Sequence, residues 1–232
     1  MPQVPQTLDA LAVRTWCGLA LEALGRAREE IDAINVYPVA DGDTGTNLYL
    51  TVESAAAAVE AVFAGYETVT GVVGPTGSAA SGAVSTEVTG AGLPTLADAV
   101  RAMAHGALIG ARGNSGTILA QLLRGMAQVL AADGAAGGET DGATDGESAH
   151  TDGQALRLAL RQAADSAREA VAHPVEGTVL TVATAAAEAA TGTEGDCGTV
   201  ACAAYEGARA ALMATPGQLA VLERAGVVDA GG

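Results

Sequence analysis

Hydrophobic positions recur at helical spacing along most of this 232-residue chain. Apolar residues three and four positions apart are typical of helices with one buried face. The pattern predicts an all-α protein of about eight helices, which cover residues 7–34, 44–64, 95–109, 118–130 and 154–172, a stretch ending near 190, residues 196–213 and a last helix after Thr215.

Several local features sharpen this prediction. In the first helix Leu11, Trp16 and Leu19 share a stripe, and we expect Trp16 to lie in the core. Thr95 is expected to cap the third helix together with Asp98, in the spacing of a capping box. Thr215 is expected to cap the last helix, with Pro216 at its first position.

Two segments do not follow the helical pattern. Residues 65–94 are rich in Gly, Thr, Ser, Ala and Val, which predicts a mobile insertion, with short strand pairing as the alternative. Residues 133–153 are acidic and rich in glycine, which predicts a disordered loop. The rest forms one domain over residues 1–232, and its ending on an apolar stretch and a glycine turn suggests truncation from a longer parent.

Composition narrows the function classes. A net charge of −16 argues against binding to nucleic acid and to anionic membranes. The chain contains no lysine, which excludes a P-loop, a protein-kinase strand lysine and a pyridoxal Schiff base. The three cysteines lack zinc-ligand spacing and are expected to be buried and inert. Without a basic leader or an apolar run of membrane-spanning length, we expect a cytoplasmic protein with no stable membrane insertion.

The segment from Asn35 to Asn47 carries the clearest candidate chemistry. Asp41 and Asp43 flank a glycine just before a helix, so their carboxylates can share one small space with the helix N-terminus. Two hard oxygen donors beside an anion site suit a magnesium–nucleotide complex. Ordinary turn and capping chemistry is the alternative. The spacing of this segment excludes an EF-hand. An aspartyl-phosphatase usually carries a later lysine, and this chain has no lysine.

Two further glycine turns precede helices. Gly110–Thr117 contains Arg, Asn and Ser, and it predicts either an oxyanion cradle or an ordinary capped turn. In Val175–Thr181, Glu176 and Thr178 could contact a metal shell or a phosphate, or could simply cap the next helix.

These motifs carry a resemblance to a known family. Asn35–Asn47, Gly110–Gly116, Pro174–Thr178 and Gly226–Gly232 resemble, in the same order, the motifs of the nucleotide-binding subunit of bacterial fatty acid kinase. That domain is related to the L-subunit of dihydroxyacetone kinase. The resemblance implies an antiparallel barrel of eight helices whose loops at one end hold ATP and two Mg²⁺ ions, and a role in phospholipid metabolism.

The resemblance also implies roles for individual residues. Asp41 and Asp43 would be catalytic metal ligands. The third aspartate of the dihydroxyacetone kinase branch is replaced here by Val36, so Asn35 or a water would supply that ligand. Arg112 is the nearest cation, with a structural salt bridge as its alternative. The implied nucleotide contacts are Thr44, Gly45, Thr46, Asn47, Arg112, Gly113, Asn114, Ser115, Gly116, Thr178 and Asp229.

In this family the phosphate acceptor is a fatty acid held by a separate fatty-acid-binding partner protein. A carboxylate is already deprotonated at neutral pH, so its phosphorylation needs no general base. Two alternatives stay open: phosphotransfer to a hydroxyl substrate, as in glycerone kinase activity, and a non-catalytic nucleotide-binding regulatory module. A homodimer is a further possibility.

Overall fold

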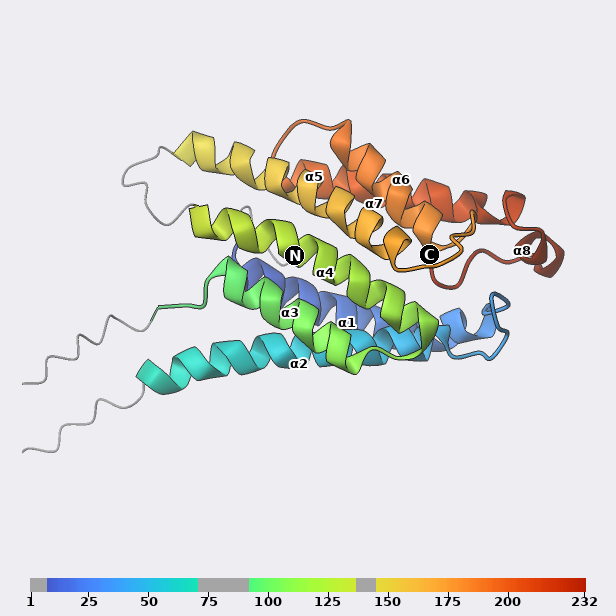
Figure 1. The fold of residues 1–232 in the computed structure, drawn as a ribbon, viewed down its shortest axis with the longest axis horizontal. Helices are drawn as coiled ribbons and strands as arrows, with labels where there is room; N and C mark the ends of the chain where they lie inside the picture. Colours follow the sequence, from blue (N-terminus) through green and yellow to red (C-terminus); the bar gives the residue numbers. More distant parts are fainter. Residues whose placement is uncertain (1–7, 71–91, 137–144) are drawn as a thin grey trace, which may run out of the picture.

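The computed structural model describes residues 8–70, 92–136 and 145–232, and this part of the chain is helical without any strand (Figure 1). The all-α prediction is confirmed. The elements are α1 (Ala10–Ala33), α2 (Thr44–Thr70), α3 (Leu96–Gly110), α4 (Gly113–Ala136), α5 (Asp145–Glu169), α6 (Val179–Thr191), α7 (Cys197–Ala214), the 3₁₀ helix η2 (Thr215–Gly217) and α8 (Ala220–Ala225).

The seven long helices pack as successive neighbours, each against the next along the chain. This arrangement brings four segments to the same end of the molecule (Figure 1): the α1–α2 loop, the α3–α4 turn, the α5–α6 loop and the chain end. The described residues form eight α-helices, of which α8 is short, so the prediction of eight helices is confirmed. Among these residues no close backbone contact joins α1 to α7.

Small residues bring the helices of the main core close together. The core contains alanines, valines and Phe63 from α1 to α5. Gly106 of α3 lies against α2, where an added Cβ would stand 2.5 Å from the Ser54 carbonyl oxygen and 2.6 Å from the Ala58 Cβ. The alanine-rich composition therefore serves close helix packing rather than helix propensity alone.

The buried face of α1 differs from the predicted one. Ala10, Val13 and Cys17 are buried, whereas Trp16 is 45% exposed, so its assignment to the core was wrong. Leu19, on the same stripe, is also exposed. Both faces of this helix carry apolar residues, and periodicity alone cannot tell which face meets the core.

The cysteine prediction holds for one of three thiols. Cys17 is buried, and desolvation raises its pKa to about 11. Cys197 is partly buried and Cys202 is exposed on α7, so they are not both core residues. The capping box of Thr95 and Asp98 is present as predicted.

Helices extend into both segments that were predicted as insertions. Helix α2 continues to Thr70, α4 continues to Ala136, and α5 already begins at Asp145. The loop prediction is therefore wrong at both ends of residues 133–153, because extending an existing helix costs less than nucleating one, even through polar sequence. Residues 71–91 and 137–144 lie outside the described part of the chain.

Thr215 does not cap the last helix. It lies in η2, where its hydroxyl donates to the Leu212 carbonyl at 2.7 Å and accepts the Asp229 backbone N–H at 3.0 Å. Helix α8 begins five residues later, at Ala220, and its N-cap residue Leu219 makes no side-chain cap. The Pro216 turn ends α7 instead of opening a long helix.

By length and composition alone, Thr44–Glu67 could cross a membrane, which the sequence prediction did not foresee. This stretch of α2 packs against α1, α3 and α4. Val52, Ala55, Val59 and Phe63 are buried in the core. Part of its apolar character is thus used in helix packing.

Candidate functional site

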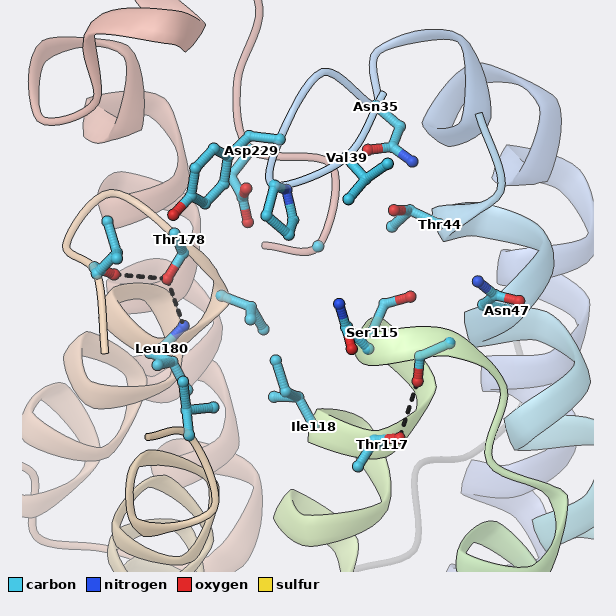
Figure 2. Close-up of a pocket in the computed structure, with 18 of the residues that line it drawn as sticks. Asn35, Val39, Thr44, Asn47, Ser115, Thr117, Ile118, Thr178, Leu180 and Asp229 are labelled. Carbon is cyan, nitrogen blue, oxygen red and sulfur yellow. Dashed lines mark hydrogen bonds between the residues drawn. The ribbon is translucent and has the colours of Figure 1, made fainter. Parts of the chain in front are cut away.

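A cavity of about 520 Å³ lies where the loops of one end converge. Its volume is in the range of small-molecule binding sites. Figure 2 shows Asn35, Thr44 and Asn47 on one side and Thr178, Leu180 and Asp229 on the other, with Ser115 of α4 between them. The lining residues are Asn35, Tyr37, Pro38, Val39, Asp41, Asp43, Thr44, Asn47, Gly113, Asn114, Ser115, Thr117, Ile118, Ala170, Val171, His173, Val175, Thr178, Val179, Leu180, Asp229 and Gly231.

Buried polar side chains gather at this cavity. Of the seven buried polar residues in the described part of the chain, five line it: Asn35, Thr44, Asn47, Thr178 and Asp229. Burying a polar group without full compensation costs free energy. Such a concentration in one place indicates a binding site rather than a by-product of packing.

The loop between α1 and α2 presents the two predicted metal ligands. Gly42 adopts a left-handed conformation, with φ of 67°, which glycine allows without strain, and it separates Asp41 from Asp43. Both aspartates line the cavity. The Nδ2 group of Asn35 donates to the Oδ1 atom of Asp41 at 2.9 Å.

This hydrogen bond fixes the orientation of the Asn35 amide. A carboxylate only accepts, so Nδ2 must face Asp41 and Oδ1 must point the other way. That Oδ1 atom is buried and has no hydrogen-bond partner. Since Asn35 is only 6% exposed, the orphaned acceptor is costly unless a ligand occupies it. The residues present therefore fit a hard cation held by the aspartates, and the Asn35 Oδ1 atom, on the side of the amide that faces away from Asp41, is a further unpaired oxygen donor at this cavity.

The charges of the cavity favour cations. The carboxylates of Asp41, Asp43 and Asp229 line it, and no arginine does so among the described residues. Within the same residues no group of three or more His, Cys, Asp or Glu side chains could hold a metal alone. Magnesium is commonly bound by one or two carboxylates plus substrate phosphates. The site thus suits a metal that arrives with, or is completed by, a phosphate ligand.

The turn between α3 and α4 supplies free backbone donors. Gly113 has φ of 57° and packs against the Asn47 side chain, which brings the N-terminus of α4 to the cavity. Among the described residues, no acceptor takes the backbone N–H groups of Gly113, Asn114 and Ser115. The Thr51 hydroxyl accepts the Arg112 N–H at 3.3 Å and so holds this turn against α2. Free N–H groups at a helix start favour an anion.

The opposite wall is formed by α6 and the chain end. Thr178 is the N-cap of α6, and its hydroxyl also donates to the Val175 carbonyl at 2.8 Å. The buried carboxyl of Asp229 has a pKa raised to about 6 by desolvation, against the lowering effect of hydrogen bonds from the backbone N–H groups of Val179, Gly231 and Gly232.

Glu176 is engaged locally and does not line the cavity. It forms an exposed ion pair with Arg168 at 2.9 Å and accepts the Thr181 hydroxyl at 2.6 Å. The Thr181 hydroxyl and the Arg168 guanidinium together lower the pKa of Glu176. These contacts satisfy its carboxylate within the α5–α6 region.

Ten of the fourteen predicted site residues come together at the cavity, and four do not: Gly45, Thr46, Arg112 and Gly116. The Thr46 hydroxyl donates to Asp32 at 2.7 Å, and its backbone N–H donates to the same carboxylate at 3.0 Å. Gly45 packs on the Arg28 carbonyl of α1. Arg112 is exposed, and no ion pair joins it to a described residue. Gly116 is buried against Thr51.

Sequence reasoning missed the apolar wall of the cavity and its histidine. Ile118, Val171, Val175 and Leu180 line the side nearest α5 and α6, and exposed His173 lies beside them. Their signal was positional: Val175 and Leu180 lie inside the Val175–Thr181 segment, and Ile118 and Val171 lie within a few residues of a predicted motif. Their aliphatic side chains carry no motif of their own.

Comparison with known proteins places this geometry in a family context. Residues 71–232 match the model of the DAK2 domain. The chain is 35% identical over 230 residues to protein YloV of Bacillus subtilis, an alignment that covers 98% of this chain and 34% of YloV. It is 36% identical over 205 residues to an uncharacterized protein of Staphylococcus haemolyticus, covering 87% of this chain and 29% of that protein. The chain therefore spans about a third of the length of the curated relatives it matches.

Proposed function

Because this chain belongs to the DAK2 domain family, and is in general terms a kinase-like nucleotide-binding domain, we propose that it binds ATP with two Mg²⁺ ions and transfers the γ-phosphate to a fatty acid carboxylate. The fatty acid is held by a separate acyl-binding protein, and the product is an acyl phosphate. The reaction takes place in the cytoplasm.

One observation carries the metal-nucleotide part of the proposal. The cavity combines three carboxylates, an orphaned buried amide oxygen and a free helix N-terminus, without an arginine in its described lining. A bare triphosphate would be repelled by the carboxylates. A cation between the carboxylates and the phosphates removes that repulsion, so the ligand that fits is a metal complex of a nucleotide.

The residues of the α1–α2 loop would hold the metal. Asp41, Asp43 and Asn35 supply oxygen ligands, and bound Mg²⁺ neutralises charge that develops on the transferred phosphoryl group. The backbone N–H groups of Asn114 and Ser115 donate to phosphate oxygens. Together these groups position and stabilise charge, which is most of the catalytic work in phosphoryl transfer.

A carboxylate acceptor agrees with the groups present. Its ionised form dominates at neutral pH because its pKa is near 4 to 5, so attack on the γ-phosphorus requires no proton removal. The cavity offers Asp41 and Asp43, which would be occupied by metal, the buried Asp229, and one exposed histidine. A partner protein that carries the lipid makes a deep lipid pocket in this domain unnecessary.

Calorimetry of ATP binding tests the proposal. Wild type should bind ATP in the presence of Mg²⁺ and lose that binding in EDTA. Asp43→Asn removes one ligand charge and should weaken Mg²⁺-dependent binding about tenfold or more. Asp165→Asn, at an exposed position on α5, is the matched control and should bind as wild type does. Equal ATP affinity in EDTA and Mg²⁺ would contradict the metal assignment.

The transfer step needs a separate assay. Acyl phosphate reacts with hydroxylamine to give a hydroxamate, which can be measured with ATP, a fatty acid and its carrier protein present. Hydroxamate that depends on Asp41 would support transfer to a carboxylate. ATP binding without any transfer would favour a regulatory nucleotide-binding module.

His173 favours a second candidate function. It is the histidine of the described cavity lining, and a hydroxyl acceptor needs a general base. If the substrate is a hydroxyl compound such as dihydroxyacetone, His173→Ala should lower turnover by about 10²-fold or more. If the substrate is a carboxylate, the same variant should leave turnover nearly unchanged.

A further inference from the structure

Three helices of this protein begin after an aspartate, and two of these aspartates cap their own helix. An N-cap side chain accepts the backbone N–H of the second or third helical residue. At the start of α1 the Asp9 carboxylate accepts the Ala12 N–H at 2.7 Å. At the start of α7 the Asp196 carboxylate accepts the Thr199 N–H at 2.8 Å. Both side chains are thereby turned back onto the first turn of the helix.

Asp43 precedes α2 in the same way but does not cap it with its side chain. Its carbonyl accepts the Asn47 N–H at 2.8 Å, the first hydrogen bond of the helix, which makes Asp43 the N-cap residue. The third N–H group of the helix, that of Thr46, donates instead to the Oδ1 atom of Asp32 at 3.0 Å. No described residue forms a hydrogen bond or an ion pair with the Asp43 carboxylate, which lines the cavity.

The cap of α2 comes from another helix, because Asp32 lies in the last turn of α1. Its Oδ2 atom also accepts the Thr46 hydroxyl at 2.7 Å, so both carboxylate oxygens bond the same residue. Gly45 permits this close approach. An added Cβ at Gly45 would overlap the Arg28 carbonyl oxygen and stand 3.0 Å from the Ile31 Cβ. The packing of α1 on the first turn of α2 therefore holds Asp32 in the capping position.

This exchange of caps leaves the Asp43 side chain available to a ligand. If Asp43 capped its own helix, binding a cation would first break the bond to the Thr46 N–H and leave that donor without a partner. Since Asp32 already satisfies the Thr46 N–H, Asp43 has no such bond to lose.

Building on the proposed binding of a magnesium–nucleotide complex, we propose that Asp32 is a positioning residue that caps α2 in place of Asp43 and so keeps the Asp43 carboxylate available as a metal ligand. Asp32 itself does not line the cavity. It acts on the metal site through the Thr46 N–H, with no contact to the metal or the nucleotide.

Urea denaturation of the ligand-free domain tests which aspartate caps α2. Loss of an N-cap carboxylate destabilises a helix, so the control variant Asp196→Ala should raise the unfolding equilibrium constant about fivefold. Asp43→Ala in the wild-type background should not raise it, because the Asp43 carboxylate makes no bond that is lost. In Asp32→Ala, Asp43 can turn to the Thr46 N–H, and adding Asp43→Ala should then raise the constant about fivefold. A fivefold rise from Asp43→Ala alone, or no rise when it is added to Asp32→Ala, would overturn the proposal.

Calorimetry of ATP binding in the presence of Mg²⁺ tests the effect on the metal site. Asp32→Ala should weaken binding about tenfold, because Asp43 must then give up a hydrogen bond to reach the metal. Asp32→Asn keeps an oxygen acceptor for the Thr46 N–H, and since Asn caps as well as Asp does, it should bind within about twofold of wild type. Equal weakening in both variants would show that Asp32 acts through its charge. Undiminished binding in Asp32→Ala would show that capping does not matter to the metal, and either result would overturn the proposal.

The two experiments separate this proposal from the proposed function. If wild type binds no nucleotide with Mg²⁺, the proposed function is wrong, and the availability of Asp43 to a metal falls with it. The capping of α2 by Asp32 is then still supported by a fivefold rise on adding Asp43→Ala to Asp32→Ala, and refuted by its absence.

Discussion

The buried carboxyl of Asp229 should make the stability of the domain depend on pH in a direction opposite to that of most carboxylates. Burial raises its pKa from 3.8 to about 6. A carboxyl whose pKa is raised on folding contributes stability that is fully present below the unfolded pKa and lost as pH rises through the folded pKa. Ionised Asp229 therefore destabilises the native state at neutral pH.

The size of this effect follows from the shift. A rise from 3.8 to about 6, at 1.36 kcal/mol per pKa unit, corresponds to about 3 kcal/mol at neutral pH. About 2 kcal/mol of this loss falls between pH 4.5 and pH 7.5, because the unfolded carboxyl is already mostly ionised at the lower value. Asp229→Asn cannot ionise and lacks this dependence.

Urea denaturation of both proteins, followed by helical circular dichroism, measures the effect. Carboxylates with lowered pKa values, such as Glu60 and Asp98, are present in both proteins and cancel in the difference. The unfolding free energy of wild type minus that of Asp229→Asn should fall by about 2 kcal/mol from pH 4.5 to pH 7.5. A difference that does not vary with pH would show only lost hydrogen bonds and would refute the reasoning.

Three further predictions concern particular contacts. Gly106→Ala places a Cβ against Ser54 and Ala58 and should cost about 1–3 kcal/mol in urea denaturation, whereas Gly18→Ala, with open space around it, should gain about 0.5–1 kcal/mol. Asn35→Ala should weaken Mg²⁺-dependent ATP binding about tenfold in calorimetry, and undiminished binding would remove Asn35 from the metal shell. Thr46→Val loses the hydroxyl bond to Asp32 and should cost about 1 kcal/mol of stability. The ATP affinity of the folded protein should stay unchanged. A lower affinity in a variant that is folded to the same extent would show that Thr46 contacts the ligand.

The helices were predictable because local sequence carries their signals. Thr95 and Asp98 form the capping box that their spacing predicted, and Thr178 caps α6 beside its glycine turn. The clustering of Asp41 and Asn114 at one end was also implied, since both follow turns at the same end of antiparallel helices. Motifs at helix starts are visible in a sequence because capping demands particular side chains.

The features that the sequence could not predict depend on tertiary packing. Trp16 lies on an outward stripe as apolar as the buried one, and only packing decides between them. Thr46 differs from Thr44 in facing α1 rather than the cavity, a distinction set by the Asp32 side chain. The wall that includes Val171 consists of aliphatic residues, whose side chains give no sign of a binding role in the sequence.

The two hydrogen bonds between Asp32 and Thr46 have a consequence for the thermodynamics of ligand binding. They join the end of α1 to the first turn of α2, so the loop that carries Asp41 and Asp43 has both ends tied before any ligand arrives. The entropy of closing that loop is lost during folding and not on association. The heat-capacity change on binding should therefore report the surface buried by the ligand itself, without a contribution from ordering of the α1–α2 loop.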